Sequence, residues 1–142
     1  MNSLFERTHL EPAKHNDNTY EYYNISARTD ISKVRDILEK WFYNYPEEEK
    51  KELKSRFKKD FDSSFFELFL YELFCKLGYN IIIHPDLPSS PKKPDFLISK
   101  NDLEIYIEAK IVKSKTMEQE AFERKRNELY DNLNKLNTKD FL

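Results

Sequence analysis

Apolar positions in the first part of the chain recur with helical spacing only after a polar start. Residues 1–28 show no clear period, although they include three clustered tyrosines, so we expect an irregular arm that docks by its aromatic rings. A helix is predicted from Asp30, a candidate N-cap, to the residue before Pro46. The following segment, PEEEKKELKSRFKKD, places proline first, acids next and bases last, which predicts a second helix with a solvated charged surface.

The segment SSFFELFLYELFCKLG is apolar on nearly all sides, which predicts a buried helix. Its start signals are Ser63 or Ser64, and its stop signal is Gly78. The stretch YNIIIHP then predicts a short buried strand, and a loop rich in proline and serine follows over residues 85–93.

Two alternating runs after this loop predict a hairpin, and an amphipathic segment predicts a long helix over residues 117–136. The apolar side of this helix carries Phe122, Leu129, Leu133 and Leu136. The final residues, KDFL, look like the start of a further strand. The predicted order is therefore a helix, three strands and another helix, and further helices come before them in the chain.

Composition limits the size and the chemistry of the protein. The 142 residues suffice for one compact domain, and because 15% of them are aromatic, burial depends mostly on phenylalanine and tyrosine. The only cysteine, Cys75, lies in the apolar helical segment, where a small buried side chain is expected. The only glycine, Gly78, excludes the glycine-rich phosphate loops of nucleotide-binding proteins.

Charge and hydropathy give further limits on partners. A formal net charge of −2 provides no global field for a polyanion, so a nucleic-acid surface would have to be a local patch. The N-terminal residues carry acids and prolines where a secretory signal needs a long apolar stretch. No run approaches the roughly 18 apolar residues of a membrane span, so we expect a cytoplasmic protein without a membrane partner.

The hairpin register brings two acids together. The dipeptide at residues 101–102 tolerates the left-handed backbone of a tight turn, so it is expected to form that turn. Lys100 then pairs with Leu103. By the same count, Asp95 lies opposite Glu108, on a face that also carries lysines. The other face is apolar throughout, which supports this register: Pro94, Phe96, Ile98, Ile105, Ile107, Ala109 and Ile111.

Two carboxylates that face each other across a strand pair repel unless a cation lies between them. Asp95 and Glu108 therefore indicate a hard divalent ion, Mg²⁺ or Mn²⁺, whose preferred ligands are oxygens. Lys110 lies further along the same face, where it could orient or deprotonate an attacking water. The alternative is a solvent-exposed face on which Lys110 and Lys93 offset the acids.

Glu67 is the third candidate acid. It points away from Glu72 and Lys76, which define the polar side of its helix, and so toward the interior. A buried carboxylate is costly unless it is paired, hydrogen-bonded or associated with a metal. The alternative is a capping box from Ser64 to Glu67, in which the glutamate bonds the N–H of the cap residue. The two interpretations are compatible.

These residues resemble the PD-(D/E)xK nuclease superfamily, with its restriction-endonuclease-like or Holliday-junction-resolvase-like fold. The similarity consists of Pro94-Asp95 at the head of one strand, Glu108-Ala109-Lys110 on the next, and Glu67 on the preceding helix. It covers residues 63–142 and implies an α/β fold with an αβββα core, in which helices flank a mixed sheet. Residues 1–62 are expected to form an N-terminal arm and a helical extension. The last strand of the core would be truncated or completed by a partner.

The resemblance implies a metal-dependent nuclease that hydrolyses phosphodiester bonds with Mg²⁺ or Mn²⁺. DNA is the expected substrate, because the superfamily mostly cuts DNA. By position, Asp95, Glu108 and the Ala109 carbonyl would be metal ligands, and Lys110 would serve the water or the transition state. Glu67 would hold a second metal or a metal-bound water.

Other residues are candidates for contacts with the nucleic acid. Basic side chains outside the motif that could contact phosphates are Lys92, Lys93, Lys113, Lys115, Arg124 and Arg126. His84 is a candidate ligand or phosphate contact, or else an ordinary histidine at a strand end.

Two other functions stay open at this point. One is a catalytically inactive nuclease-fold module that binds nucleic acid or protein. The other is a structural adaptor in which the motif is accidental and Glu67 is only a cap. A homodimer or a protein partner, held through the N-terminal extension or the open sheet edge, is a further expectation.

Overall fold

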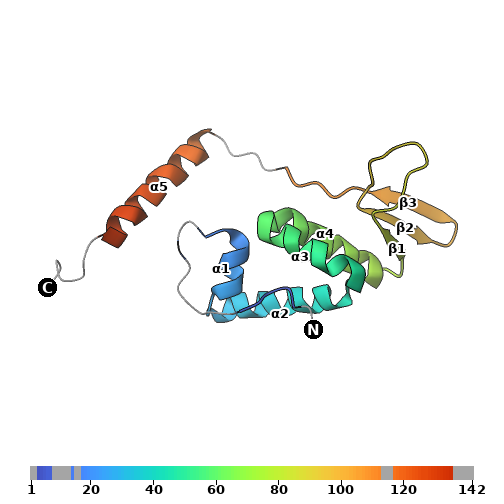
Figure 1. Ribbon diagram of the computed structural model, residues 1–142, viewed down its shortest axis with the longest axis horizontal. Coiled ribbons are helices and arrows are strands. Elements are labelled where there is room, and N and C mark those ends of the chain that lie inside the picture. The colour runs from blue at the N-terminus through green and yellow to red at the C-terminus, as the bar shows by residue number, and fades with distance from the viewer. Residues whose placement is uncertain (1–2, 8–13, 15–16, 113–116, 136–142) are drawn as a thin grey trace. The chain divides into compact units, whose positions relative to one another are not determined.

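The computed structural model describes residues 3–7, 14, 17–112 and 117–135 (Figure 1). The chain divides into two compact units, of which the first ends at Ile111 and the second contains Val112 and the C-terminal helix. The elements of the first unit are α1 (Thr19–Ile25), α2 (Thr29–Asn44), α3 (Glu47–Lys59), α4 (Phe61–Lys76), β1 (Asn80–Ile83), β2 (Phe96–Lys100) and β3 (Leu103–Ile107). The second unit holds α5 (Met117–Lys135). The protein is thus mixed α/β, as predicted.

The helices of the first unit enclose its main hydrophobic core. Its buried members come from the N-terminal residues and from all of the first four helices: Leu4, Phe5, Tyr20, Leu38, Phe42, Tyr45, Leu53, Phe57 and Leu68. The boundary expected at residue 62 falls inside α4, and this core is built from residues on both sides of it. Residues 1–62 therefore contribute directly to the surroundings of α4.

A short helix stands where an irregular arm was expected. Helix α1 begins after Asn18, whose side chain accepts a hydrogen bond of 2.9 Å from the N–H of Glu21. Its seven residues are too few to show a helical period in the sequence. Tyr20 is buried in the core, so the expected docking through an aromatic ring is confirmed.

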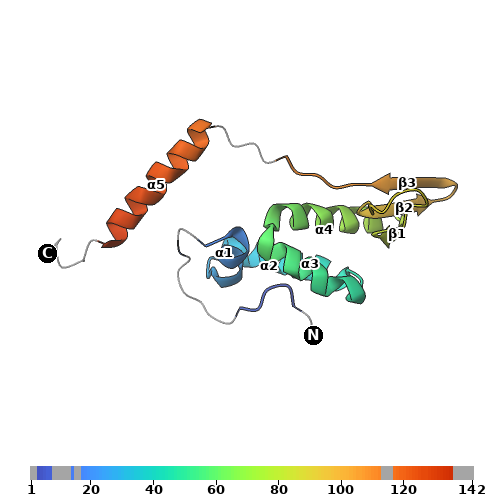
Figure 2. The same cartoon turned by 45° about the horizontal axis from the view of Figure 1, so that its top comes forward.

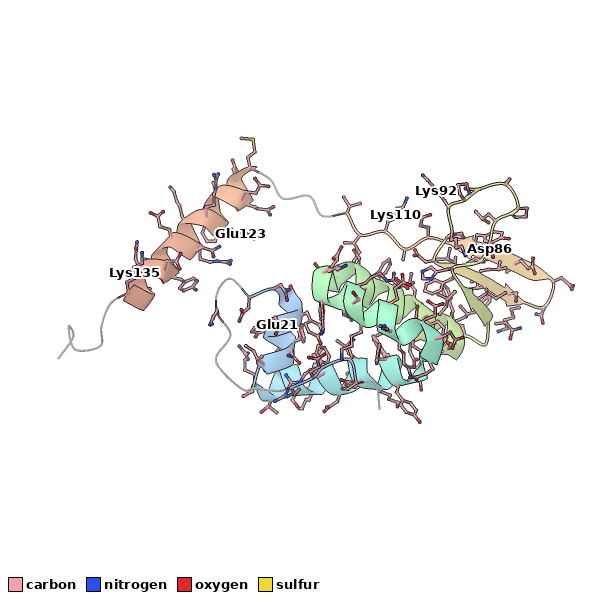
Figure 3. The ribbon with its side chains drawn as sticks, viewed as in Figure 1. Glu21, Asp86, Lys92, Lys110, Glu123 and Lys135 are labelled. Carbon is pink, nitrogen blue, oxygen red and sulfur yellow. The ribbon has the colours of Figure 1, made fainter. Side chains whose placement is uncertain are left out.

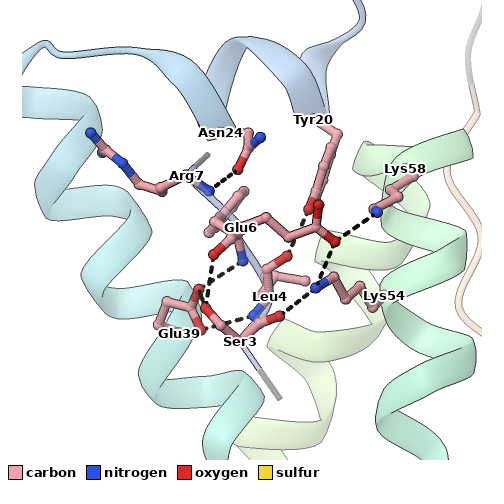
Figure 4. Close-up of polar contacts among 10 residues, drawn as sticks. Ser3, Leu4, Glu6, Arg7, Tyr20, Asn24, Glu39, Lys54 and Lys58 are labelled. Atoms are coloured by element: carbon pink, nitrogen blue, oxygen red, sulfur yellow. Dashed lines mark hydrogen bonds and ion pairs between the residues drawn. The ribbon is translucent and has the colours of Figure 1, made fainter. Parts of the chain in front are cut away.

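The N-terminal residues 3–7 pack against the helices, with two of their side chains in the core (Figure 4). Leu4 and Phe5 are buried, and the Glu39 carboxylate on α2 accepts their backbone N–H groups at 3.0 and 2.8 Å. The Tyr20 hydroxyl donates to the Leu4 carbonyl at 2.7 Å. Side chains thus satisfy backbone groups that a strand partner would satisfy in a sheet.

Glu39→Ala should lower the free energy of unfolding by about 2 kcal/mol, because it leaves two partly buried backbone N–H groups without acceptors. Urea denaturation followed by circular dichroism measures the loss. Asp36→Ala, at an exposed position of the same helix, is the control and should change stability by less than about 0.5 kcal/mol. Equal effects of the two substitutions would contradict this role of Glu39.

The start of α2 differs from the prediction. The helix begins at Thr29 with Arg28 at the N-cap position, and Asp30 lies in the first turn, where its carboxylate pairs with Arg28 at 2.9 Å. The expected cap at Asp30 is therefore wrong, because the helix already begins at Thr29 and Asp30 lies inside its first turn. The predicted end before Pro46 is confirmed, and α3 begins directly after that proline.

Helix α4 starts earlier than predicted. Asp60 is its N-cap and accepts the N–H of Ser63 at 3.4 Å, while the Ser64 hydroxyl donates to the Asp60 carbonyl at 2.9 Å. A cap at Ser63 or Ser64 is therefore wrong, since Asp60 is the better-placed acceptor. Gly78, with a φ of 76°, follows the helix end as predicted.

The prediction that α4 is buried on all sides is also wrong. Phe69 and Leu73 are exposed, and so is Cys75, for which burial was expected. Glu72, assigned to the polar side, is buried and accepts a hydrogen bond from Asn44 at 3.3 Å. The reason is tertiary: α4 contacts α2 and α3 as well as β1, and these elements leave one of its sides uncovered within the described chain.

The described strands form an antiparallel sheet in the order β1-β2-β3, which lies at the C-terminal end of α4 (Figures 1 and 2). Phe96 of β2 is fully buried, and its ring contacts those of Tyr71 and Phe74 on α4. The expected burial of β1 is wrong, because it is an edge strand and Ile82 is 56% exposed. A mixed sheet needs a parallel strand, and the candidate KDFL lies outside the described residues.

The second unit contains the predicted C-terminal helix. Helix α5 spans Met117–Lys135, in agreement with the predicted range as far as the structure describes it. Phe122, Leu129 and Leu133 on its apolar side are exposed, and Leu136 lies outside the described residues. None of the helices in the described ranges has the length and apolar character needed to cross a bilayer.

Candidate functional site

The β2–β3 hairpin has the predicted register. Lys100 pairs with Leu103, and the turn residue Asn101 has a φ of 55°, in the left-handed region. Continuing this register past the last paired residues places Asp95 opposite Glu108. The two predicted acids therefore lie at the open end of the hairpin, one directly before β2 and the other directly after β3.

Backbone hydrogen bonds fix Asp95 between its two neighbours. Its Oδ2 accepts the N–H of Ala109 at 2.6 Å, across the extension of β3. Its carbonyl accepts the N–H of His84 at 3.0 Å, next to the end of β1. The half-buried carboxylate is thus held at the point where the ends of all three strands meet.

The three predicted acids influence one another electrostatically. Burial raises the pKa of Asp95, and the hydrogen bond from Ala109 opposes this shift. The negative charges of Glu67 and Glu108 raise that pKa further, while His84 lowers it. Burial and two neighbouring acids thus favour the protonated form of Asp95, while the Ala109 N–H and His84 favour its carboxylate.

Asp95→Asn should raise the melting temperature at pH 7 by about 2–5 °C. Asparagine carries no charge to bury and still offers an oxygen to the Ala109 N–H. The pKa of Asp95 is higher in the folded protein than in the unfolded chain, so protonated Asp95 favours folding. This contribution to stability is complete below the unfolded pKa and is lost as pH rises through the folded pKa. The gain in melting temperature, measured by thermal unfolding, should therefore shrink at acidic pH. A melting temperature below that of the wild type at pH 7 would contradict a destabilising charge on Asp95.

Glu108 and Lys110 form an exposed ion pair of 3.1 Å at the same end of the hairpin. Figure 3 shows Lys110 directed outward from the chain that follows β3, and 76% of its side chain is exposed. Lys110 therefore offsets part of the charge of Glu108, as the alternative interpretation of this face expects. Lys93 does not take part in this, because it pairs with Asp86 at 2.8 Å.

Glu67 is buried, as predicted, but a cation from another helix already holds it. Arg56 on α3 donates from its two terminal nitrogens to the two carboxylate oxygens, with 2.8 Å between Nη2 and Oε1. The Tyr45 hydroxyl donates to Oε1 at 3.0 Å. Burial raises the pKa of Tyr45 well above its usual range, so this hydroxyl keeps its proton. These bonds, rather than a capping box with Ser64, satisfy the carboxylate.

Sequence reasoning missed Arg56 and Tyr45. Arg56 belongs to a run of alternating charges that was read as a solvated surface, and Tyr45 ends the preceding helix. One signal was available: Arg56 directly precedes Phe57, which is fully buried, so its side chain leaves the helix close to the core.

His84 has an unusual backbone. Its φ of 48° is rare for a residue with a Cβ, and such strain tends to cluster at functional sites. Its Nδ1 lies 3.5 Å from a carboxylate oxygen of Glu49 on α3. The histidine thus links α3 to Asp95, and its side chain has a partner, as the ordinary interpretation expects.

The basic residues proposed to contact phosphates are divided between the two units. Lys92 is exposed on the loop between β1 and β2 (Figure 3), and Lys93 is paired with Asp86. Arg124 and Arg126 are exposed on α5, in the second unit. Two further candidates, Lys113 and Lys115, lie outside the described residues. Binding of nucleic acid by this set stays a prediction.

The residues at the hairpin end suit a hard divalent ion in part. Asp95 and Glu108 supply carboxylate oxygens, the donors that Mg²⁺ prefers, although Glu108 already pairs with Lys110. Glu67 does not suit such an ion as it is arranged, because Arg56 and Tyr45 occupy its oxygens. Accordingly, no group of three or more His, Cys, Asp or Glu side chains among the described residues is arranged to hold a metal.

Comparison with known proteins adds no relative. The chain matches no protein-family model, no curated protein and no solved structure.

Proposed function

We propose that this protein is a divalent-metal-dependent nuclease that hydrolyses phosphodiester bonds of nucleic acid, most readily of DNA. The observation that carries the proposal is the hairpin register, in which Asp95 falls opposite Glu108 at the open end, with Lys110 two residues further along. The order α4, β1, β2, β3, α5 is consistent with the αβββα order of the PD-(D/E)xK fold. The preference for DNA rests on the resemblance to that superfamily alone.

Each residue of the site has a role in this proposal. Asp95, Glu108 and the Ala109 carbonyl would hold Mg²⁺ or Mn²⁺, which acts as a Lewis acid on the phosphodiester when it is bound. Lys110, with its exposed ammonium group, would orient the attacking water or balance negative charge on the phosphate. A homodimer or protein partner, held through an open edge of the sheet or through the N-terminal extension, belongs to the same proposal.

Cleavage assays test this function. The full chain is incubated with plasmid DNA and with single-stranded DNA in the presence of Mg²⁺ or Mn²⁺, and the products are separated on gels. We expect cleavage that EDTA abolishes and that Asp95→Asn also abolishes, although this variant is more stable than the wild type. Cleavage of equal rate by the wild type and by Asp95→Asn would come from a contaminant and would contradict the proposal.

A second candidate function is an inactive nuclease-fold module that binds nucleic acid or protein. The bidentate contact between Arg56 and Glu67 favours it, because this ion pair removes one acid from the set that catalysis would use. DNA binding without cleavage, equal in the wild type and in Asp95→Asn, is the result expected of such a module.

A further inference from the structure

Strand β3 is an edge strand without the features that usually block the addition of a further strand. Its neighbour among the described strands is β2, so its other side presents unpaired backbone groups. Proteins commonly protect such an edge with lysine, proline or a bulge, but β3 reads LEIYI and pairs with β2 in a regular register. Leu103 and Ile105 are 49% and 38% exposed. This edge is therefore open to another strand.

The opposite edge of the sheet is blocked. Strand β1 has only four residues. It is followed by His84, whose φ of 48° turns the chain out of the strand conformation, and by Pro85, which has no backbone N–H to donate. Of the two edges, β3 is thus the one suited to strand addition.

Residues 103–111, with the sequence LEIYIEAKI, keep one alternating pattern beyond the end of β3. In Figure 2 the chain runs on in the direction of the strand, and the N–H of Ala109 still bonds Asp95. One face carries apolar side chains throughout: Leu103, Ile105, Ile107, Ala109 and Ile111. The other face carries side chains with polar groups: Glu104, Tyr106, Glu108 and Lys110.

This segment is complementary to itself when two copies run antiparallel. With Ile107 opposite Ile107 of a second copy, Glu104 lies opposite the partner's Lys110, which is a favourable cross-strand pair. In the same register, Leu103 lies opposite the partner's Ile111 on the apolar face. Twofold symmetry forms each of these pairs twice.

Other registers bring acids together. A twofold axis perpendicular to the sheet keeps each side chain on its own face, so one residue must lie opposite itself. With Ile105 in that position, Asp102 lies opposite the partner's Glu108. With Tyr106 there, Glu104 lies opposite the same acid, and Glu104 at the centre would oppose itself. Because like charges directly opposite each other are destabilising, these registers are disfavoured.

Resting on the homodimer named in the proposed function, we infer that residues 103–111 of two copies pair antiparallel along the β3 edge, with Ile107 next to the twofold axis. The two sheets then form one, in the order β1-β2-β3-β3-β2-β1. Lys100 and Leu103 flank a two-residue turn and so form a hydrogen-bonded pair, which directs the backbone groups of Glu104 and Tyr106 away from β2. These groups make the hydrogen bonds to the second copy.

Sedimentation equilibrium of the full chain, in EDTA and without nucleic acid, tests this pairing. We expect a dimer with a Kd of about 1–100 μM, since a strand edge is a small interface. Glu104→Lys should raise this Kd about 5- to 50-fold, because it places lysine opposite Lys110 twice. Asp36→Lys is the matched control: it makes the same charge change at an exposed position of α2 and should leave the Kd unchanged. Combining Glu104→Lys with Lys110→Glu restores opposite charges and should recover the dimer.

Disulfide formation tests the register. In a Cys75→Ser background, Ile107→Cys should form an intermolecular disulfide on mild oxidation, because the two Cα atoms of such a pair lie about 4.5 Å apart. Ile105→Cys should not, since these positions of the two copies would lie about 13 Å apart along the strands. A disulfide in the Ile105→Cys variant instead would overturn the register.

The outcomes separate this inference from the nuclease activity. A monomer at every concentration, or a dimer that Glu104→Lys leaves unchanged, would overturn the pairing through β3, and metal-dependent cleavage by the same preparation would leave the nuclease proposal in place. A dimer that responds to Glu104→Lys but cleaves no DNA with either metal would retain the pairing and overturn the nuclease.

Discussion

Lys110→Ala should lower the rate of metal-dependent DNA cleavage by about 10²- to 10⁴-fold, the usual contribution of a positioned acid or base. Binding of Mn²⁺ should persist, because Lys110 is not among the proposed ligands. The substitution should also leave the fold intact, since the side chain is mostly exposed and pairs with Glu108 on the surface. Cleavage rates and Mn²⁺ affinity measured on the same preparation give both quantities.

A second lysine serves as the control for this result. Lys40 is exposed on α2, so Lys40→Ala removes the same charge without touching the hairpin. Its cleavage rate should equal that of the wild type. Equal losses in both variants would mean that Lys110 contributes only to the general attraction of DNA, and would contradict its catalytic role.

Glu67→Ala should destabilise the protein by about 3 kcal/mol, because removing one partner of a buried ion pair leaves the other charge uncompensated. Arg56 would lose both carboxylate contacts, and the Tyr45 hydroxyl would lose its acceptor. The partial exposure of Arg56 places the expected loss at the lower end of the range for buried pairs. Urea denaturation measures this loss.

Two comparisons show whether the ion pair is the cause. Glu108→Ala removes an acid from the same site, but its side chain is 58% exposed, so we expect a change below about 0.5 kcal/mol. Replacing the pair with apolar residues, Arg56→Met with Glu67→Leu, should recover much of the stability. Equal stability of Glu67→Ala and the wild type would show that the contact contributes nothing to the fold.

The hairpin was predictable because its determinants are local. Alternation of apolar and polar residues, together with a turn dipeptide that tolerates positive φ, fixes the register of β2 and β3 without reference to the rest of the chain. The bounds of the long helices followed from proline and glycine for similar reasons. Helix α1 was not predicted, because its seven residues are too few to show a helical period of apolar positions.

Features that depend on distant packing could not be predicted. The burial of Glu67 followed from its angular position on α4, but its partners lie on two other helices, and no sequence spacing connects them. The same holds for Glu72 and Cys75: a helical wheel gives the relative directions of their side chains but not which sides of α4 its neighbours cover. The predicted acids are thus partly gathered by local rules, while the counterion of Glu67 arises from tertiary structure.

The most direct test of the account is the binding of Mn²⁺ to the full chain by electron paramagnetic resonance, compared between the wild type and Glu108→Gln. This substitution removes one charge from the exposed end of the hairpin and leaves the buried pair of Arg56 and Glu67 untouched. The account predicts a bound ion in the wild type and a loss of affinity of at least about tenfold in the variant. Equal affinity of the two proteins, or no bound ion in either, would contradict a metal site at Asp95 and Glu108.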